Sequence, residues 1–178
     1  MPPSQLRAVP PAAGEYATPF AGYVARVPSG DIVTTIRGQL PSTLSLLRAV
    51  EPARTITGYA PGKWSIRDIV QHMADTERVM SYRALRIARG DLTPLPGFDE
   101  NAYAPAAGAS ARSMESLLAE LETVRASTVT LLDGVPGEAW ERRGTASGNP
   151  VTVRALAWII AGHERHHVAI IRDRYLTD

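Results

Sequence analysis

Residues 152–171, TVRALAWIIAGHERHHVAII, decide the fold that we expect for this chain. One stripe of this segment recurs at steps of four and three residues, which is typical of one face of an α-helix. The stripe consists of Leu156, Ile160, His163, His167 and Ile170. Thr152 is a good N-cap residue, so the pattern predicts a helix that begins after it and ends near Tyr175.

Three further segments carry apolar residues at helical spacing, and they span residues 29–50, 65–89 and 113–133. Pro41 lies inside the first of them, so we expect a kink there. Ser65 and Asp68 begin the second with a variant of the capping box. No segment alternates with period two between hairpin turns. The pattern therefore predicts an all-α protein without strands, built as a four-helix bundle.

The regions between these helices are rich in proline, glycine and alanine. Residues 91–112 form a long loop, and a loop of this length in a compact domain is often functional. Residues 135–150 form a second loop, whose glycine-rich part we interpret as a turn. Residues 1–19 contain five prolines and no apolar run, so we expect an extended or poorly ordered segment. Residues 20–178 are then expected to form one bundle domain.

Composition excludes several classes of function. The 178 residues include 19 Lys and Arg against 18 Asp and Glu, so no net basic field favours a nucleic-acid partner. The longest apolar stretch, residues 155–162, is too short to cross a bilayer, and the N-terminus lacks the apolar core of a signal peptide. We therefore expect a soluble cytoplasmic protein. The absence of cysteine excludes disulfides, a thiolate nucleophile, iron–sulfur clusters and cysteine-based zinc sites.

Histidine is the informative residue type, because the chain has four and three of them fall between residues 163 and 167. His163 and His167 occupy the apolar stripe one helical turn apart, where two imidazoles can share one metal ion. His72 lies beside apolar residues of the second helix and faces the core or its border, so three imidazoles could converge. His166 should lie on the flank. The alternative is a structural pair of core histidines, each with a polar partner of its own.

Residues 163–167 also match H-E-x-x-H, the signature of zinc metallopeptidases. In that chemistry the glutamate activates water and a third ligand usually lies downstream. Only 11 residues follow His167, and none of them is His or Glu. The peptidase is therefore the least favoured interpretation, and we interpret Glu164 as a solvated surface residue or a partner of a ligand.

A spaced set of motifs carries a resemblance to a known family. The set comprises residues 59–66, 96–103, 143–149 and 163–167, together with His72, Asp75, Glu77, Arg78, Tyr82 and Arg83. It resembles the DinB-like/YfiT-like superfamily of metal-binding four-helix bundles over about residues 16–175. The resemblance implies an up-down-down-up bundle and often a homodimer. It also implies a divalent metal ion, usually zinc or nickel, with His72, His163 and His167 as its ligands.

Three neutral imidazoles leave an open coordination position for water or for a substrate. Bound water could hydrolyse an ester or amide, whereas a bound low-molecular-weight thiol could attack an electrophile. Members of the family with an activity use such thiols in transfer or isomerisation, so the resemblance implies a thiol S-transferase or a hydrolase. The alternative is a non-catalytic dimeric module that binds a metal or a small molecule.

Five further side chains are candidates for the site. Asp75 lies three residues after His72, so it and Glu164 are the catalytic candidates. Arg83 shares the face of His72 and could bind a carboxylate at the mouth of a pocket, although an ion-paired helix arginine is the alternative. Asn101 and Tyr103 could face the pocket from the loop that covers it, or could pack against other loops.

Overall fold

The computed structural model describes residues 6–177, and four long helices form its bundle: α3 (Ile32–Arg48), α4 (Ile66–Ala88), α6 (Met114–Asp133) and α7 (Val153–Ile170). The shorter elements are the helices α2 (Ala21–Val24) and α5 (Glu100–Ala106) and the strands β1 (Arg143–Ala146) and β2 (Asn149–Thr152). Short 3-10 helices lie at Thr18–Phe20, Pro52–Thr55, Ala109–Ala111 and Gly137–Glu141, and a π-helical turn lies at Ile171–Tyr175. The mostly helical architecture confirms the helical class that the periodicity predicts.

The helix starts follow the local signals in the sequence. The Ser65 side chain accepts a hydrogen bond from the Asp68 N–H, and the Asp68 carboxylate accepts one from the Ser65 N–H, which completes the expected capping box. The Thr152 hydroxyl accepts a hydrogen bond from the Ala155 N–H at 3.0 Å and caps α7. Beyond Ile170 the chain continues as a π-helical turn to Tyr175, the position at which we expect the last helix to end.

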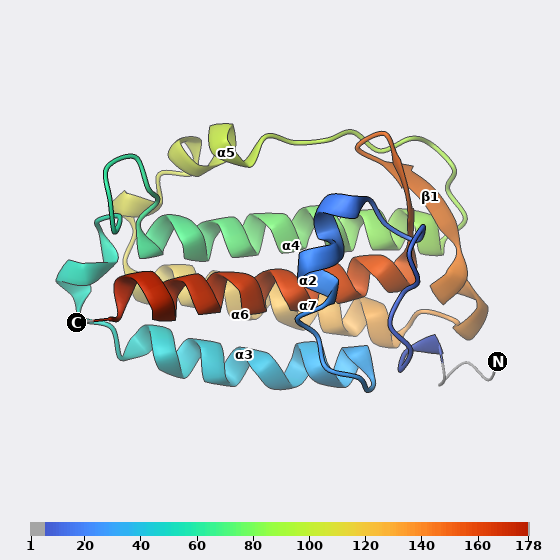
Figure 1. Cartoon of the computed structure of the whole chain (residues 1–178), viewed down its shortest axis with the longest axis horizontal. Helices are drawn as coiled ribbons and strands as arrows, with labels where there is room; N and C mark the ends of the chain where they lie inside the picture. The colour runs from blue at the N-terminus through green and yellow to red at the C-terminus, as the bar shows by residue number, and fades with distance from the viewer. Residues whose placement is uncertain (1–5, 178) are drawn as a thin grey trace.

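The connection between α4 and α6 runs back along the length of the bundle (Figure 1). The expectation of a plain loop over residues 91–112 is wrong, because α5 and a 3-10 turn at Ala109–Ala111 lie within it. The Asp99 carboxylate caps α5 by accepting hydrogen bonds from two backbone N–H groups. Leu95 donates its N–H to the Thr145 carbonyl at 2.9 Å and so ties this connection to the strands.

The expectation of no strands is also wrong, because β1 and β2 form an antiparallel hairpin in which Ala146 lies opposite Asn149. Ser147 and Gly148 connect the strands with φ of 50° and 75°, the positive values that a two-residue hairpin turn requires. Each strand has four residues. Such a strand is too short to show a clear alternation in the sequence.

The segment before the bundle packs against the start of α7. Leu6 is buried, and the Glu15 carboxylate, 5% exposed, accepts a hydrogen bond from the Thr152 hydroxyl at 2.8 Å. Arg154 forms an ion pair with the same carboxylate. Residues 1–5, part of the expected extended segment, lie outside the described residues.

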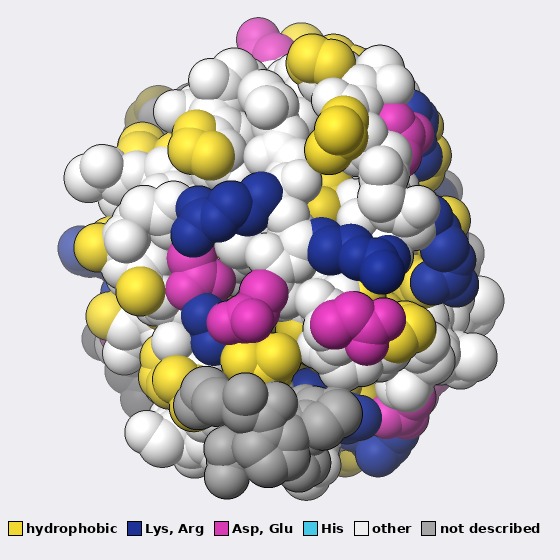
Figure 2. Space-filling view, turned by 90° about the vertical axis from the view of Figure 1, so that its right-hand side faces the viewer, with side chains coloured by type: hydrophobic (Ala, Val, Ile, Leu, Met, Phe, Trp, Pro, Cys, Tyr) yellow, Lys and Arg dark blue, Asp and Glu magenta, His cyan; other side chains and the backbone are white. Residues whose placement is uncertain are grey.

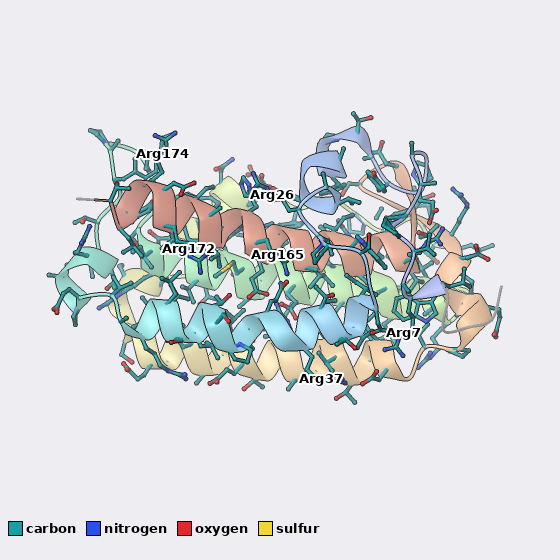
Figure 3. The ribbon with its side chains drawn as sticks, turned by 60° about the horizontal axis from the view of Figure 1, so that its bottom comes forward. Arg7, Arg26, Arg37, Arg165, Arg172 and Arg174 are labelled. Atoms are coloured by element: carbon teal, nitrogen blue, oxygen red, sulfur yellow. The ribbon has the colours of Figure 1, made fainter. Side chains whose placement is uncertain are left out.

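Charged side chains of both signs are interspersed on the end of the molecule that carries the hairpin and the N-terminus (Figure 2). Arg7 and Arg37, which Figure 3 labels, both form ion pairs with Asp133, the last residue of α6. This face therefore has no field of a single sign. Within residues 6–177, no helix combines the length and apolarity needed to cross a membrane.

Helix α7 is the central element, because every residue from Val153 to Gly162 is buried. A helix that is apolar all round must be enclosed on all sides. Helix α2 crosses α7 at Gly162, where an added Cβ would lie 2.0 Å from the Tyr23 carbonyl oxygen. Only glycine allows this approach, which places the Tyr23 ring beside that of His163, with 5.4 Å between their centroids.

Candidate metal centre

Helices α4 and α7 bring three histidines together: His72 from α4, His163 and His167 from α7. The Nε2 atom of His163 lies 2.9 Å from Nε2 of His72 and 3.1 Å from Nε2 of His167. In a tetrahedral zinc site with bonds of about 2.0–2.1 Å, two ligand nitrogens lie about 3.3 Å apart. Both distances to His163 are therefore within a few tenths of an ångström of this spacing, and the ligand atoms of all three histidines lie within 4.8 Å of one another.

Burial keeps these rings neutral. His163 and His167 are 6% and 8% exposed, and His72 is half-buried. Burial lowers the pKa of His72 to about 4 and that of His167 to about 3, and it lowers the pKa of His163 well below its usual range. A neutral imidazole is the form that binds a metal ion, so the donor set is ready at neutral pH.

The Nδ1 atoms of His72 and His167 differ in their surroundings. The Nδ1 atom of His72 faces the Thr76 hydroxyl at 3.4 Å, which leaves its Nε2 for the cluster. The Nδ1 atom of His167 is buried and has no hydrogen-bond partner among the described residues, so Nε2 is the polar contact of that ring. His166 lies outside the cluster, partly exposed, with its ring against Tyr23.

Cavities reach the cluster from two sides. One cavity of about 320 Å³ is lined by His72, His163, Tyr23, Arg83 and Glu100, among others. A second cavity of about 270 Å³ is lined by His167 with Trp64, Tyr59 and Asn101. A ligand of the ion could therefore enter without unfolding either helix.

The other site residues predicted from the sequence do not share one cavity. Arg83 lines the first cavity, whereas Asn101 lines the second. Tyr103 is 48% exposed and lines a third cavity, which it shares with Arg83. Asp75 accepts a hydrogen bond from Gln71 at 3.0 Å and lines neither cavity that reaches the histidines.

Glu164 faces away from the cluster, into the interior between α3, α6 and α7. It is 3% exposed, so the interpretation as a solvated surface residue is wrong. Its carboxylate accepts hydrogen bonds from the Thr43 hydroxyl at 2.5 Å and from the Gln39 amide, and it forms an ion pair with Arg125 at 2.8 Å. Helix geometry turns successive residues by about 100°, which separates Glu164 from the face of His163.

Arg125 connects this carboxylate to a second one. Its guanidinium donates two hydrogen bonds of 2.8 Å to Glu77, and a third of 2.9 Å to the Ile36 carbonyl. Burial opposes the charge on Arg125, but the hydrogen bonds and charge of Glu77 and then Glu164 outweigh it and hold its pKa above the usual value. Two carboxylates and one guanidinium thus lie in the interior beside the metal-binding helices.

Glu100 is the residue that sequence reasoning missed. It begins α5 and lines the first cavity with His72 and His163. Two features of the sequence could have indicated Glu100. It lies in residues 96–103, the segment expected to cover the pocket, and it directly follows Asp99, the residue that caps the start of α5.

Comparisons with known proteins show which family the chain is similar to. The sequence pattern of the DinB superfamily matches residues 1–171. A protein of Oceanobacillus iheyensis, provisionally named a metal-dependent hydrolase, is 28% identical over 142 residues, which are 79% of each chain. A protein of Bacillus licheniformis with the same provisional name is 28% identical over 120 residues, 65% of this chain and 67% of its own.

The solved structure of YfiT from Bacillus subtilis, described as a probable metal-dependent hydrolase with an unusual four-helix bundle topology, is similar in fold. Its TM-score is 0.68 at 17% identity, and the match covers 95% of both chains. This neighbour supports the bundle, and the family pattern covers nearly the whole sequence. The chain belongs to the DinB superfamily.

Proposed function

We propose that the protein is a metal-dependent hydrolase that acts on a small molecule at the centre formed by His72, His163 and His167. The observation that carries the proposal is the approach of three Nε2 atoms, in which that of His163 lies 2.9 Å from that of His72 and 3.1 Å from that of His167. His72 and His163 line a cavity of about 320 Å³ that a small molecule can enter. The provisional names of the relatives support the same class of reaction.

A divalent ion held by three histidines supplies an acidified water, or an acidified thiol, as a nucleophile at neutral pH. The chain's own residues complete the site. Glu100 is the carboxylate of the first cavity and accepts the proton that the nucleophile gives up. Tyr23 packs its ring against that of His163 in the wall of this cavity.

The proposal has finer parts that the family resemblance supplies. The ion is zinc or nickel, the protein is a cytoplasmic homodimer, and the helices follow the up-down-down-up order, which the long return from α4 to α6 supports. Transfer of a low-molecular-weight thiol is the second reaction proposed for this site. The absence of cysteine means that the sulfur would come from a cosubstrate.

Metal analysis tests the centre directly. Purified wild-type protein should retain about one equivalent of metal after dialysis, whereas His72→Ala, His163→Ala and His167→Ala should lose it. His166→Ala is the matched control, because His166 lies on the same helix but outside the cluster. Equal metal content in wild type and His72→Ala would refute the three-histidine centre.

Activity assays then separate the candidate reactions. Hydrolysis of an ester or amide panel that disappears with chelator and in His163→Ala would support the hydrolase. Product formed only when a thiol and an electrophile are both present would support the transferase. Glu100→Gln should lower kcat and leave metal content unchanged. Metal binding with no turnover in any panel would favour the non-catalytic module, and cleavage of a peptide would favour the peptidase.

A further inference from the structure

The first cavity contains a buried cation without an anionic partner. Arg83 is 3% exposed, and its guanidinium is held by the Pro96 carbonyl at 2.7 Å and the Ser147 hydroxyl at 3.0 Å, both of which accept from Nη2. Its Nη1 atom faces the Met80 sulfur at 3.6 Å. Between residues 6 and 177, no carboxylate lies within ion-pair distance of this side chain.

The other buried arginines show how unusual this is. Three arginines of the described chain are buried: Arg83, Arg125 and Arg154. Arg125 is paired with Glu77, and Arg154 is paired with Glu15. Buried charges are normally paired, because an unpaired ion loses its hydration without compensation. Arg83 therefore lacks the carboxylate partner that the fold supplies to Arg125 and to Arg154.

Arg83 is also placed to bind an anionic group of a ligand in the cavity that reaches the histidines. One stripe of α4 forms a wall of the first cavity, and it consists of His72, Thr76, Met80 and Arg83. Arg83 lies 11 residues beyond His72, a rise of about 16 Å along the axis. Helical side chains lean toward the N-terminus, and the contact with Met80 shows that Arg83 does so, which shortens the distance to the histidines.

The cavity wall opposite α4 contributes an aromatic ring and a carboxylate. The Phe98 ring lies 5.9 Å from the Arg83 guanidinium carbon, so one face of the cation is covered by an aromatic ring. Glu100 also lines the cavity, and its charge contributes, after burial, to the raised pKa of Tyr23 beside the histidines. The cavity thus has a cationic end at Arg83 and a metal-binding end with an acidic residue near it.

We propose that Arg83 binds the carboxylate of the substrate, and that the protein therefore acts on small carboxylic acids whose reacting group lies several bonds away, at the histidines. This inference rests on the proposed function for the reacting end, but the anion site stands on Arg83 alone. A guanidinium offers paired N–H donors that match a carboxylate, which a neutral substrate could not use.

The first test uses metal-free protein and so does not depend on catalysis. Hexanoate should bind about 10- to 100-fold more tightly than hexanamide in a titration followed by NMR, the range expected for a hydrogen bond to a charged group. Arg83→Met should remove this preference and Arg83→Lys should keep part of it. Arg89→Met changes an exposed arginine six residues further along the chain, so it is the control and should behave as wild type.

The comparison of hexanoate with hexanamide uses only the wild-type protein, so it tests the proposal even if Arg83→Met fails to fold. Equal binding of hexanoate and hexanamide to wild type would overturn the proposal. Equal preference in wild type and a folded Arg83→Met would do the same. Ser147→Ala, which removes one acceptor of Arg83, should weaken hexanoate binding less than Arg83→Met does.

The second test joins the two ends of the cavity. Cobalt-loaded protein is titrated with 6-mercaptohexanoate and 6-mercaptohexanol, and the sulfur-to-cobalt absorption band reports binding at the histidines. A preference for the acid that disappears in Arg83→Met supports the inference. Equal affinity for the two thiols overturns it and leaves the metal centre standing. Selective hexanoate binding without any cobalt band supports the anion site and overturns the open metal position.

Discussion

Removing Arg125 should strongly destabilise the protein, because this guanidinium is paired with both carboxylates of the interior cluster. Arg125→Met removes the two 2.8 Å hydrogen bonds to Glu77, the 2.8 Å ion pair with Glu164 and the 2.9 Å hydrogen bond to the Ile36 carbonyl. The Arg125 and Glu164 side chains are each 4% exposed, so water cannot replace the lost contacts.

The expected magnitude follows from burial. Breaking a buried ion pair by removing one partner costs about 3–5 kcal/mol, and here one substitution leaves two carboxylates unpaired. A domain of this size has about 5–15 kcal/mol of folding free energy in total. The matched control is Arg48→Met, whose partner Glu122 lies 3.5 Å away with both side chains about half exposed. Such a surface pair contributes about 0–1 kcal/mol.

Urea denaturation of the metal-free proteins, followed by circular dichroism, measures both variants. With an m-value of about 2 kcal/mol per molar urea, the Arg125→Met midpoint should fall by about 2 M and the Arg48→Met midpoint by less than about 0.5 M. Adding Glu77→Leu to Arg125→Met should recover part of the loss, because one unpaired carboxylate is removed. An Arg125→Met midpoint close to that of Arg48→Met would refute the reasoning.

Three further outcomes are expected. Metal affinity, measured by competition with a chelator of known protonation constants, should stay constant from pH 7 to about 5 and fall at lower pH. The reason is that burial lowers the pKa of His72 to about 4. A tenfold fall in affinity per pH unit that begins at about pH 6.5, the ordinary pKa of histidine, would contradict this. Gly162→Ala should lower the thermal midpoint by an amount equivalent to about 1–3 kcal/mol, because its Cβ would meet the Tyr23 carbonyl, whereas Gly38→Ala has open space and should not destabilise α3. Ser65→Ala should cost about 1 kcal/mol in urea denaturation through loss of the N-cap of α4, and an unchanged midpoint would show that the cap is unimportant.

The parts of the fold that sequence predicts well are those set by local interactions. A cap such as Ser65 acts on backbone groups three residues away, so its effect can be recognised without knowing the tertiary structure. The stripe that holds His163 and His167 follows from helical geometry in the same way. The hairpin escapes this approach, because its strands of four residues owe their pairing to the Ser147 and Gly148 turn and to contacts with Leu95.

The candidate site shows the same limit at the level of single side chains. Periodicity assigns a helix one buried face, and rejection of the peptidase leaves Glu164 to be interpreted as a solvated surface residue or a partner of a ligand. Helix α7 is buried on all sides from Val153 to Glu164, so a residue about 100° from the stripe is buried there as well. The apolar run before His163 carried this information, because a helix that is apolar all round is central. Glu100 could not be found by such reasoning, since its place in the cavity depends on the path of the connection from α4 to α6.

The H-E-x-x-H match therefore contains two separate structural features. His163 and His167 share the face toward His72, where their Nε2 atoms can hold an ion. Glu164 points to another side, where Arg125, Thr43 and Gln39 already occupy its oxygens. A peptidase glutamate must reach water bound beside the histidines, which this carboxylate could do only by leaving its buried partners. The helix thus places the ligands on one face, and on another face it places the ion pair that holds the ligand helix against α3 and α6.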